Sequence, residues 1–182
     1  MTRPSNVLSS TLDLLRVIGG LILANALLSW WFTSSPTWGY DGRWVDYRYL
    51  KFRAFESPVR LTLDELSLYN GTSPELPIYV AINGTVYDVT SSPRFYGPGG
   101  TYHAFSGRDS ARAFVTGCYD KEDELTHDLR GLDKDEIEDQ LGGWIRFFGN
   151  NRRYWVAGTV DLPEPTGEIP SPCEHQRYPG HA

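Results

Sequence analysis

The sequence has few of the residues that most often bind metals or carry catalysis. Its 182 residues include two cysteines and four histidines. The histidines show no paired ligand spacing and there is no CxxC motif, so the sequence does not indicate a zinc site. Two cysteines do not make a disulfide framework. Because Cys118 lies in the body of the chain and Cys173 lies in its tail, we expect no bridge between them.

Clustered basic charge and the common nucleotide-binding motifs are also missing. The net charge of −6 argues against a nucleic-acid partner, because proteins of that class neutralise phosphates with clustered Lys and Arg. The sequence contains no hydrolase elbow, P-loop or dinucleotide fingerprint, and no evident nucleophile–base set. We therefore expect a binding protein and not an enzyme.

One long apolar segment is present, at residues 12–32. Its length is close to the roughly 20 residues that a helix needs to cross a bilayer. Asp13 and Arg16 are spaced to pair on one helix face at the membrane edge. Trp30 and Trp31 lie where an interfacial aromatic belt is found. We predict a transmembrane anchor over 12–32, preceded by an N-terminal segment, 1–11.

A cleaved signal peptide is the alternative for this segment. Ala24-Asn25-Ala26 has the small-x-small form of a cleavage site. The apolar run continues past that site to Phe32, which favours the uncleaved anchor.

Three further segments follow the anchor. Residues 33–57 form a juxtamembrane connector that is rich in aromatic residues and has neither helical nor strand periodicity. These aromatic residues either lie at the headgroup level or pack on the domain. Residues 58–160 are the predicted folded domain. Prolines recur throughout residues 161–182, which we predict to be a disordered tail.

The sequence of the domain predicts short helices together with a small sheet, which is the α+β class. Thr62 with Glu65, and Asp133 with Glu136, have the spacing of capping boxes at helix starts. Asn83-Gly84 between two β-rich runs predicts a hairpin with a two-residue turn. The apolar stripe of the last predicted helix comprises Ile137, Leu141, Trp144 and Phe148.

One stretch of glycines and aromatic residues resembles a known motif. Residues 95–109, FYGPGGTYHAFSGRD, resemble the haem-pocket motif of the membrane-associated progesterone receptor family, whose members have cytochrome b5-like haem/steroid-binding domains. Residues 82–90, 107–112 and 153–158 resemble that family's hairpin, helix start and last strand. The resemblance runs in order from about Leu61 to Val160 and implies a cytochrome b5-like fold. Residues 125–132 also resemble the secreted neudesin branch.

The resemblance assigns roles to four residues. Tyr102 matches the tyrosine whose phenolate is the axial ligand of haem iron. Tyr96 matches a tyrosine that lines the pocket and supports it by hydrogen bonding, and Tyr154 matches a second pocket tyrosine. Arg153 stands where relatives carry a lysine near the haem, and a guanidinium differs from an ammonium in geometry.

The chemistry of such a site is coherent. Tyrosine is an established axial ligand of haem iron, and ferric iron stabilises the anionic phenolate. A bis-histidine cytochrome b5 would show His-Pro-Gly-Gly, but here Gly97 precedes Pro98. The glycines around Tyr102 would let the backbone approach a flat macrocycle. We therefore expect ferric, tyrosinate-ligated haem as the cofactor, at a potential too low for ordinary electron shuttling.

The resemblance also implies a function. It indicates a non-catalytic, membrane-anchored haem-binding protein of the endoplasmic reticulum or another endomembrane, which supports haem-thiolate monooxygenases in sterol metabolism or carries haem. The alternatives are a sterol-binding or adaptor module without haem, and a secreted, neudesin-like signalling protein. The sequence specifies neither the physiological ligand nor the oligomeric state.

The side of the membrane on which the domain lies is weakly indicated. More basic residues flank the apolar segment on its C-terminal side, namely Arg43, Arg48, Lys51 and Arg53 against Arg3 and Arg16. The positive-inside rule thus favours a cytosolic domain. Against it stand Asn70-Gly71-Thr72 and Asn83-Gly84-Thr85, both of glycosylation-acceptor form.

Overall fold

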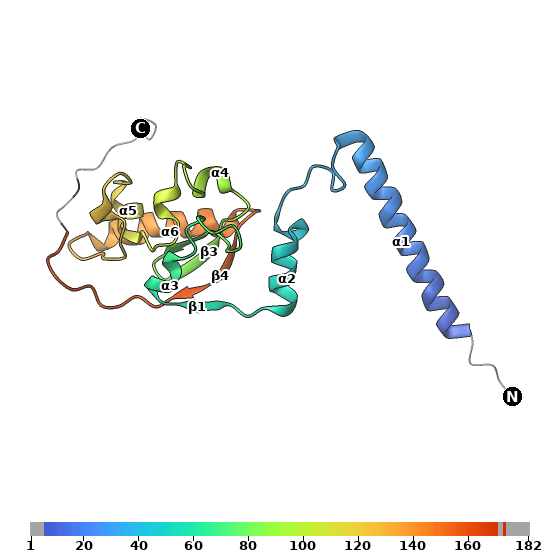
Figure 1. The fold of residues 1–182 in the computed structure, drawn as a ribbon, viewed down its shortest axis with the longest axis horizontal. Coiled ribbons are helices and arrows are strands. Elements are labelled where there is room, and N and C mark those ends of the chain that lie inside the picture. The colour runs from blue at the N-terminus through green and yellow to red at the C-terminus, as the bar shows by residue number, and fades with distance from the viewer. Residues whose placement is uncertain (1–5, 171–172, 174–182) are drawn as a thin grey trace.

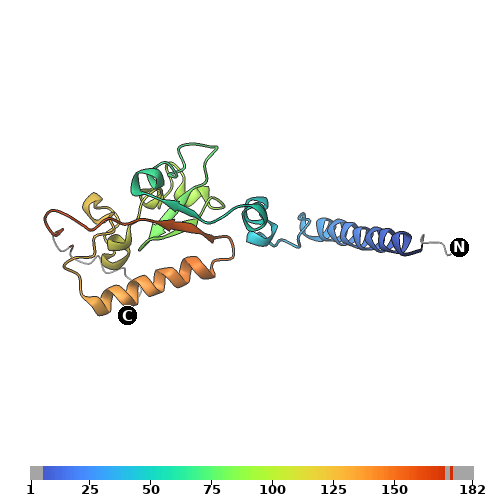
Figure 2. The ribbon, with the colours of Figure 1, turned by 90° about the horizontal axis from the view of Figure 1, so that it is seen from below.

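The structure, a computed structural model, describes residues 6–170 and Cys173. A long N-terminal helix, α1 (Asn6–Thr33), extends away from a folded α+β domain, and a short helix, α2 (Tyr47–Phe55), lies between them (Figures 1 and 2). The domain therefore stands at the end of a stalk formed by α1 and the connector.

Helix α1 has the properties of a candidate membrane span. Its segment Ser10–Thr33 is 24 residues long, is apolar along its length, and buries none of its most apolar window against the rest of the protein. Arg16 pairs with Asp13 at 2.8 Å, as their spacing predicted. A signal sequence would form the same helix, so the anchor and the cleaved leader both remain open.

A four-stranded sheet forms the centre of the domain. Its strands are β1 (Val59–Leu61), β2 (Tyr79–Ile82), β3 (Thr85–Asp88) and β4 (Trp155–Val160), in the order β1-β4-β3-β2. Strand β1 is parallel to β4, and the other pairs are antiparallel. The turn between β2 and β3 has positive φ at Asn83 (47°) and Gly84 (84°), as a type I′ turn requires. The predicted hairpin is confirmed.

Short helices surround the sheet. They are α3 (Leu63–Ser67), α4 (Pro93–Tyr96), α5 (Ala111–Thr116) and α6 (Lys134–Asn150), with 3-10 turns at Arg43–Val45, His103–Phe105 and Glu122–Glu124. Thr62 and Glu65 make both bonds of the predicted capping box. Leu141 and Phe148 of α6 are buried in the core, as the apolar stripe predicted.

Two apolar clusters cover the two faces of the sheet. Val80 and Ile82 of β2 join the larger cluster under α5 and α6, whereas Tyr79 and Ala81 join the smaller one near α3 and β1. This alternation follows from the two-residue period of a strand. The larger cluster also contains Tyr96, Phe105, Phe114, Phe148 and Tyr154. The core thus borders directly on the residues that the sequence nominated for binding.

The connector is more ordered than we expected. It contains α2, whose N-cap Asp46 accepts a hydrogen bond from the Arg48 amide. Tyr49 is the residue of α2 that is buried, and its ring lies 5.3 Å from that of Trp155. A helix that is held by one buried side chain shows no apolar stripe in the sequence. The prediction from hydrophobic periodicity therefore missed α2. The connector packs on the domain, one of the two alternatives.

The C-terminal segment also departs from its prediction. In place of disorder, the described residues 161–170 make specific contacts with the domain, and Cys173 forms a disulfide with Cys118 across a Cα–Cα distance of 6.6 Å. The expectation that these cysteines stay unbridged is wrong. Proline lacks an N–H but keeps a carbonyl acceptor, and the domain donates to several of these carbonyls. Predictions for 171–172 and 174–182, including His175 and His181, lie outside the described residues.

The turn geometry yields a stability prediction. Gly84→Val should lower the free energy of unfolding by about 2 kcal/mol, because a β-branched residue is strained at a φ of 84°. Gly149→Ala, on the exposed side of α6 with open space around its Cα, is the matched control. It should leave stability unchanged or raise it by up to about 1 kcal/mol. Urea unfolding of the full chain in detergent measures both, and equal effects would contradict the strained turn.

Candidate functional site

The domain has a large open pocket between the Gly-rich loop, α5 and α6. Its volume is about 970 Å³, at the upper end of the roughly 300–1,000 Å³ typical of ligand sites. Half of the residues that line it are aromatic: Tyr96, Tyr102, Phe105, Phe114, Tyr119, Trp144, Phe147 and Phe148. A wall of this kind suits a flat, largely apolar ligand.

A tight turn brings the nominated tyrosines together. The amide of Tyr102 donates to the Phe95 carbonyl at 2.8 Å, so the chain folds back directly after α4. The ring of Tyr102 then lies 6.1 Å from that of Phe95 and 6.0 Å from that of Tyr96. The pocket wall is therefore built by local backbone hydrogen bonding.

Glycine is required in this turn for a local reason. A Cβ at Gly97 would stand 2.5 Å from the Pro93 carbonyl oxygen, and one at Gly100 would stand 2.4 Å from the Phe95 carbonyl oxygen. Both contacts are too short for any side chain. We expected these glycines to let the backbone approach a ligand, but the structure shows that two of them let the backbone approach itself.

Tyr96 and Tyr102 differ in their surroundings. Tyr96 is 5% exposed, and burial, followed by the neighbouring Tyr154, raises the pKa of Tyr96 well above that of an ordinary phenol. Its hydroxyl therefore stays protonated and can donate a hydrogen bond. Tyr102 is 41% exposed on the pocket wall. Of the two, Tyr102 is the residue that is more accessible to a ligand.

The other two nominated residues do not line the pocket. Tyr154 is buried behind Tyr96, and its hydroxyl donates to Ser92 Oγ at 3.0 Å. This bond ties the start of β4 to the residue that precedes α4. Arg153 instead forms an ion pair with Asp41 of the connector, which Arg152 also contacts at 2.7 Å. The structure thus brings Tyr96 and Tyr102 to the pocket, places Tyr154 behind them, and directs Arg153 to the connector.

Sequence reasoning missed the polar side of the pocket. Helix α6 contributes Glu136, Asp139, Gln140, Gly143 and Arg146 to the lining. These residues share one helical stripe beside the apolar one, and that spacing was visible in the sequence. The acidic residues lie toward the start of α6, while Arg146 lies toward its end. A ligand carboxylate would therefore be attracted to the Arg146 end of the pocket and repelled from the other.

Hydrogen bonding holds α5 and α6 together at this site. The indole N–H of Trp144 donates to the Phe114 carbonyl at 3.0 Å, and the two rings lie 4.9 Å apart. Within the described residues, no three His, Cys, Asp or Glu side chains gather as a metal site. An organic cofactor that brings most of the ligands of its iron would need only one further ligand from the protein. An open phenol on an aromatic wall fits such a cofactor.

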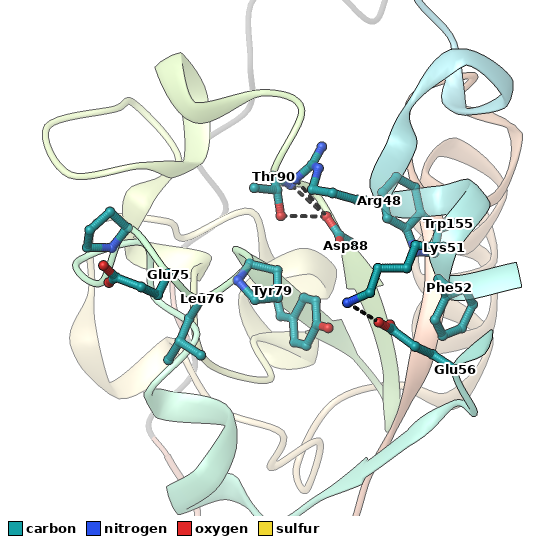
Figure 3. Close-up of a pocket in the computed structure, with 12 residues that line it drawn as sticks. Arg48, Lys51, Phe52, Glu56, Glu75, Leu76, Tyr79, Asp88, Thr90 and Trp155 are labelled. Carbon is teal, nitrogen blue, oxygen red and sulfur yellow. Dashed lines mark hydrogen bonds and ion pairs between the residues drawn. The ribbon is translucent and has the colours of Figure 1, made fainter. Parts of the chain in front are cut away.

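A second, smaller pocket lies between α2 and the sheet (Figure 3). It measures about 270 Å³, and four of the five charged residues that line it form ion pairs within it. Lys51 meets Glu56 at 2.8 Å, and Arg48 lies 4.0 Å from Asp88, whose pKa is raised by burial. Because Arg48 of α2 pairs here with Asp88 of β3, this pocket is best described as the joint between the connector and the domain.

Comparison with known proteins matches most of the folded domain to one family. A model of the family described as "Cytochrome b5-like Heme/Steroid binding domain" matches residues 62–139. "Membrane steroid-binding protein 1" of Arabidopsis thaliana is 38% identical over 125 residues, covering 66% of this chain and 54% of the relative. "Neuferricin" of Danio rerio is 38% identical over 117 residues, covering 64% of this chain and 42% of the relative.

A solved structure extends this likeness to the fold. It is of a hypothetical Arabidopsis thaliana protein described as having a cytochrome b5 like fold. It is 41% identical, covers 57% of this chain and 91% of that one, and has a TM-score of 0.51. The predicted α+β, cytochrome b5-like fold is confirmed. The chain spans about half the length of the two named relatives.

Proposed function

We propose that this chain, which belongs to the membrane-associated progesterone receptor family of cytochrome b5-like haem/steroid-binding proteins, binds ferric haem through Tyr102. The observation that carries the proposal is that Tyr102 is partly exposed on the wall of a large aromatic pocket. Tyrosine is an established axial ligand of haem iron. The match to residues 62–139 includes both Tyr96 and Tyr102.

Each part of the pocket has a role in this proposal. Tyr102 would supply the oxygen that holds the iron, and Tyr96, kept protonated by burial, would donate a hydrogen bond to that oxygen. The rings of Phe105, Phe114 and Trp144 would contact the faces and edges of the flat ligand. Arg146 would pair with a carboxylate of the ligand. An anionic oxygen ligand stabilises ferric over ferrous iron, so the bound haem would be a poor electron shuttle.

The protein would act by binding and would perform no turnover. One candidate role, drawn from family membership, is support of haem-thiolate monooxygenases in sterol metabolism at the endoplasmic reticulum, with the domain in the cytosol. The candidate span α1 and the membrane-associated names of the relatives support membrane anchoring. A sterol in the same pocket, in place of haem, is the alternative ligand, since a neutral flat molecule also suits an aromatic wall.

A second candidate role is favoured by one specific observation. The chain has a disulfide, Cys118–Cys173. Disulfides persist in oxidising compartments outside the cytosol and are rare within it. With this disulfide, the domain would be a haem-binding module in the lumen or outside the cell. The two roles place the domain on opposite sides of the membrane.

The ligand assignment predicts a spectroscopic result. Titrating hemin into the full chain in detergent should give a tyrosinate-type ferric spectrum, and Tyr102→Phe should abolish it and weaken binding at least about tenfold. Tyr96→Phe should weaken binding roughly fivefold, because it loses one hydrogen bond worth about 1 kcal/mol. An unchanged spectrum in Tyr102→Phe would refute the assignment, and binding of a sterol but not of hemin would favour the alternative ligand.

The placement of the two arginines gives a matched pair of variants. Arg146→Ala should weaken hemin binding roughly two- to fivefold by removing a partly exposed charge pair. Arg153→Ala should leave hemin binding unchanged, because Arg153 pairs with Asp41 outside the pocket. Hemin titration of both variants measures this. The reverse pattern would restore Arg153 as the ligand-binding cation expected from the family.

The side of the membrane separates the two roles. In sealed membrane vesicles, we expect the domain to be protected from added protease, because its disulfide needs an oxidising compartment. Asn83, exposed in its turn, should then carry a glycosidase-sensitive glycan that Asn83→Gln removes. A protease-accessible domain without glycan would favour the monooxygenase role. Co-purification with such an enzyme and altered sterol profiles on deletion would then support that role.

A further inference from the structure

The C-terminal segment forms a strap across one end of the domain. We define the strap as residues 162–170 together with Cys173, and Figure 1 shows it leaving β4 and running past the loop before α6 toward α5. Leu162 packs on the smaller apolar cluster. Farther along, the carbonyl of Pro163 lies 3.0 Å from Nε2 of His127, and that of Thr166 accepts from Arg130.

The strap ends on a buried ionic site. Arg112 of α5 is 1% exposed, and its guanidinium donates to the carbonyls of Asp128 and Arg130 and, at 3.2 Å, to that of Pro170 in the strap. Arg112 also lies 3.2 Å from the fully buried Glu124, which accepts from Thr116 at 2.7 Å. A buried charge that loses an acceptor is destabilised. Release of the strap would therefore disturb the environment of Arg112 in α5.

The disulfide attaches the strap to the wall of the pocket. Cys118 is itself buried, but Thr116 and Gly117 before it and Tyr119 after it all line the pocket. Gly117 ends α5 in the left-handed region, with a φ of 73°. Cys118 thus lies in a turn that lines the pocket, and its disulfide with Cys173 joins this turn to the end of the strap.

We propose that the Cys118–Cys173 bond is a redox latch on the ligand pocket. In an oxidising compartment the bond holds the strap against α5 and keeps the turn around Gly117 in its binding geometry. A dithiol reductant cleaves the bond by exchange: the S–S bond breaks, two cysteine thiols form with two electrons and two protons from the reductant, and the reductant becomes a disulfide. The freed strap then leaves Arg112, and the pocket wall loosens.

The proposed latch depends on the proposed function in one respect only, which is that haem is taken as the ligand of the pocket. Its consequence is weaker binding in the reduced state, by about fivefold or more, which is the usual lower range of coupling between two sites. Its structural consequence is independent of any ligand. The strap contains the exposed Glu168, so its release can be followed by a glutamate-specific protease.

The test uses the full chain in detergent, with hemin as the added ligand. Thiol alkylation followed by mass measurement should label no cysteine before reduction and two after it. Reduced protein, and the variant Cys173→Ser with or without reductant, should bind hemin at least about fivefold more weakly than oxidised protein and be cut faster at Glu168. Reoxidation should restore both properties to the reduced wild type, which separates release of the strap from unfolding. Cys118→Ala combined with Cys173→Ala keeps the buried site apolar and should behave like Cys173→Ser.

Three outcomes would overturn the latch. Alkylation of both cysteines without reduction would show that the bond does not form. Equal cutting at Glu168 in oxidised and reduced protein would show that the strap stays in place without the bond. Equal hemin affinity in the two states, despite faster cutting, would show that the strap does not control the pocket. If hemin binds neither state, the haem assignment fails, and the cutting rates still decide whether the bond holds the strap.

Discussion

A single buried carboxylate connects the sheet to the pocket. Asp109 is 2% exposed and accepts hydrogen bonds from the amides of Asn83 and Gly84 in the hairpin turn and of Ala111 at the start of α5. Burial raises the pKa of Asp109, and these three bonds oppose that rise. Because the hairpin turn and the start of α5 share this one acceptor, Asp109 fixes the position of the α5 wall of the pocket relative to the sheet.

The features that could be predicted from the sequence are local ones. The Asn83-Gly84 turn needs only positive φ at two adjacent residues, and the capping box at Thr62 needs only a partner three residues later. Helix α2 could not be found this way, because its one buried residue, Tyr49, is stabilised by contact with Trp155 far along the chain. The bridge between Cys118 and Cys173 spans 55 residues, and sequence spacing does not report such a contact.

The same difference between local and distant contacts explains why only part of the candidate site could be predicted from the sequence. Tyr96 and Tyr102 lie in one short motif, so family resemblance placed them correctly beside each other. Arg153 was assigned by position, but its partner Asp41 lies 112 residues earlier, in a segment that we read as irregular. Arg146 went unnoticed because it shares α6 with a stronger apolar stripe. For Arg153 the deciding contact comes from a distant segment of the chain.

Both segments that flank the domain are attached close to its pocket. On the connector side, Arg43 donates to the Tyr154 carbonyl, and Tyr154 in turn contacts Tyr96 behind the pocket wall. On the strap side, the disulfide joins Cys173, at the end of the strap, to Cys118 in a turn beside the pocket. The family match to residues 62–139 contains neither Tyr154 nor the strap. Since the position of a pocket wall depends on the contacts that hold it, these flanking contacts would influence what the pocket binds.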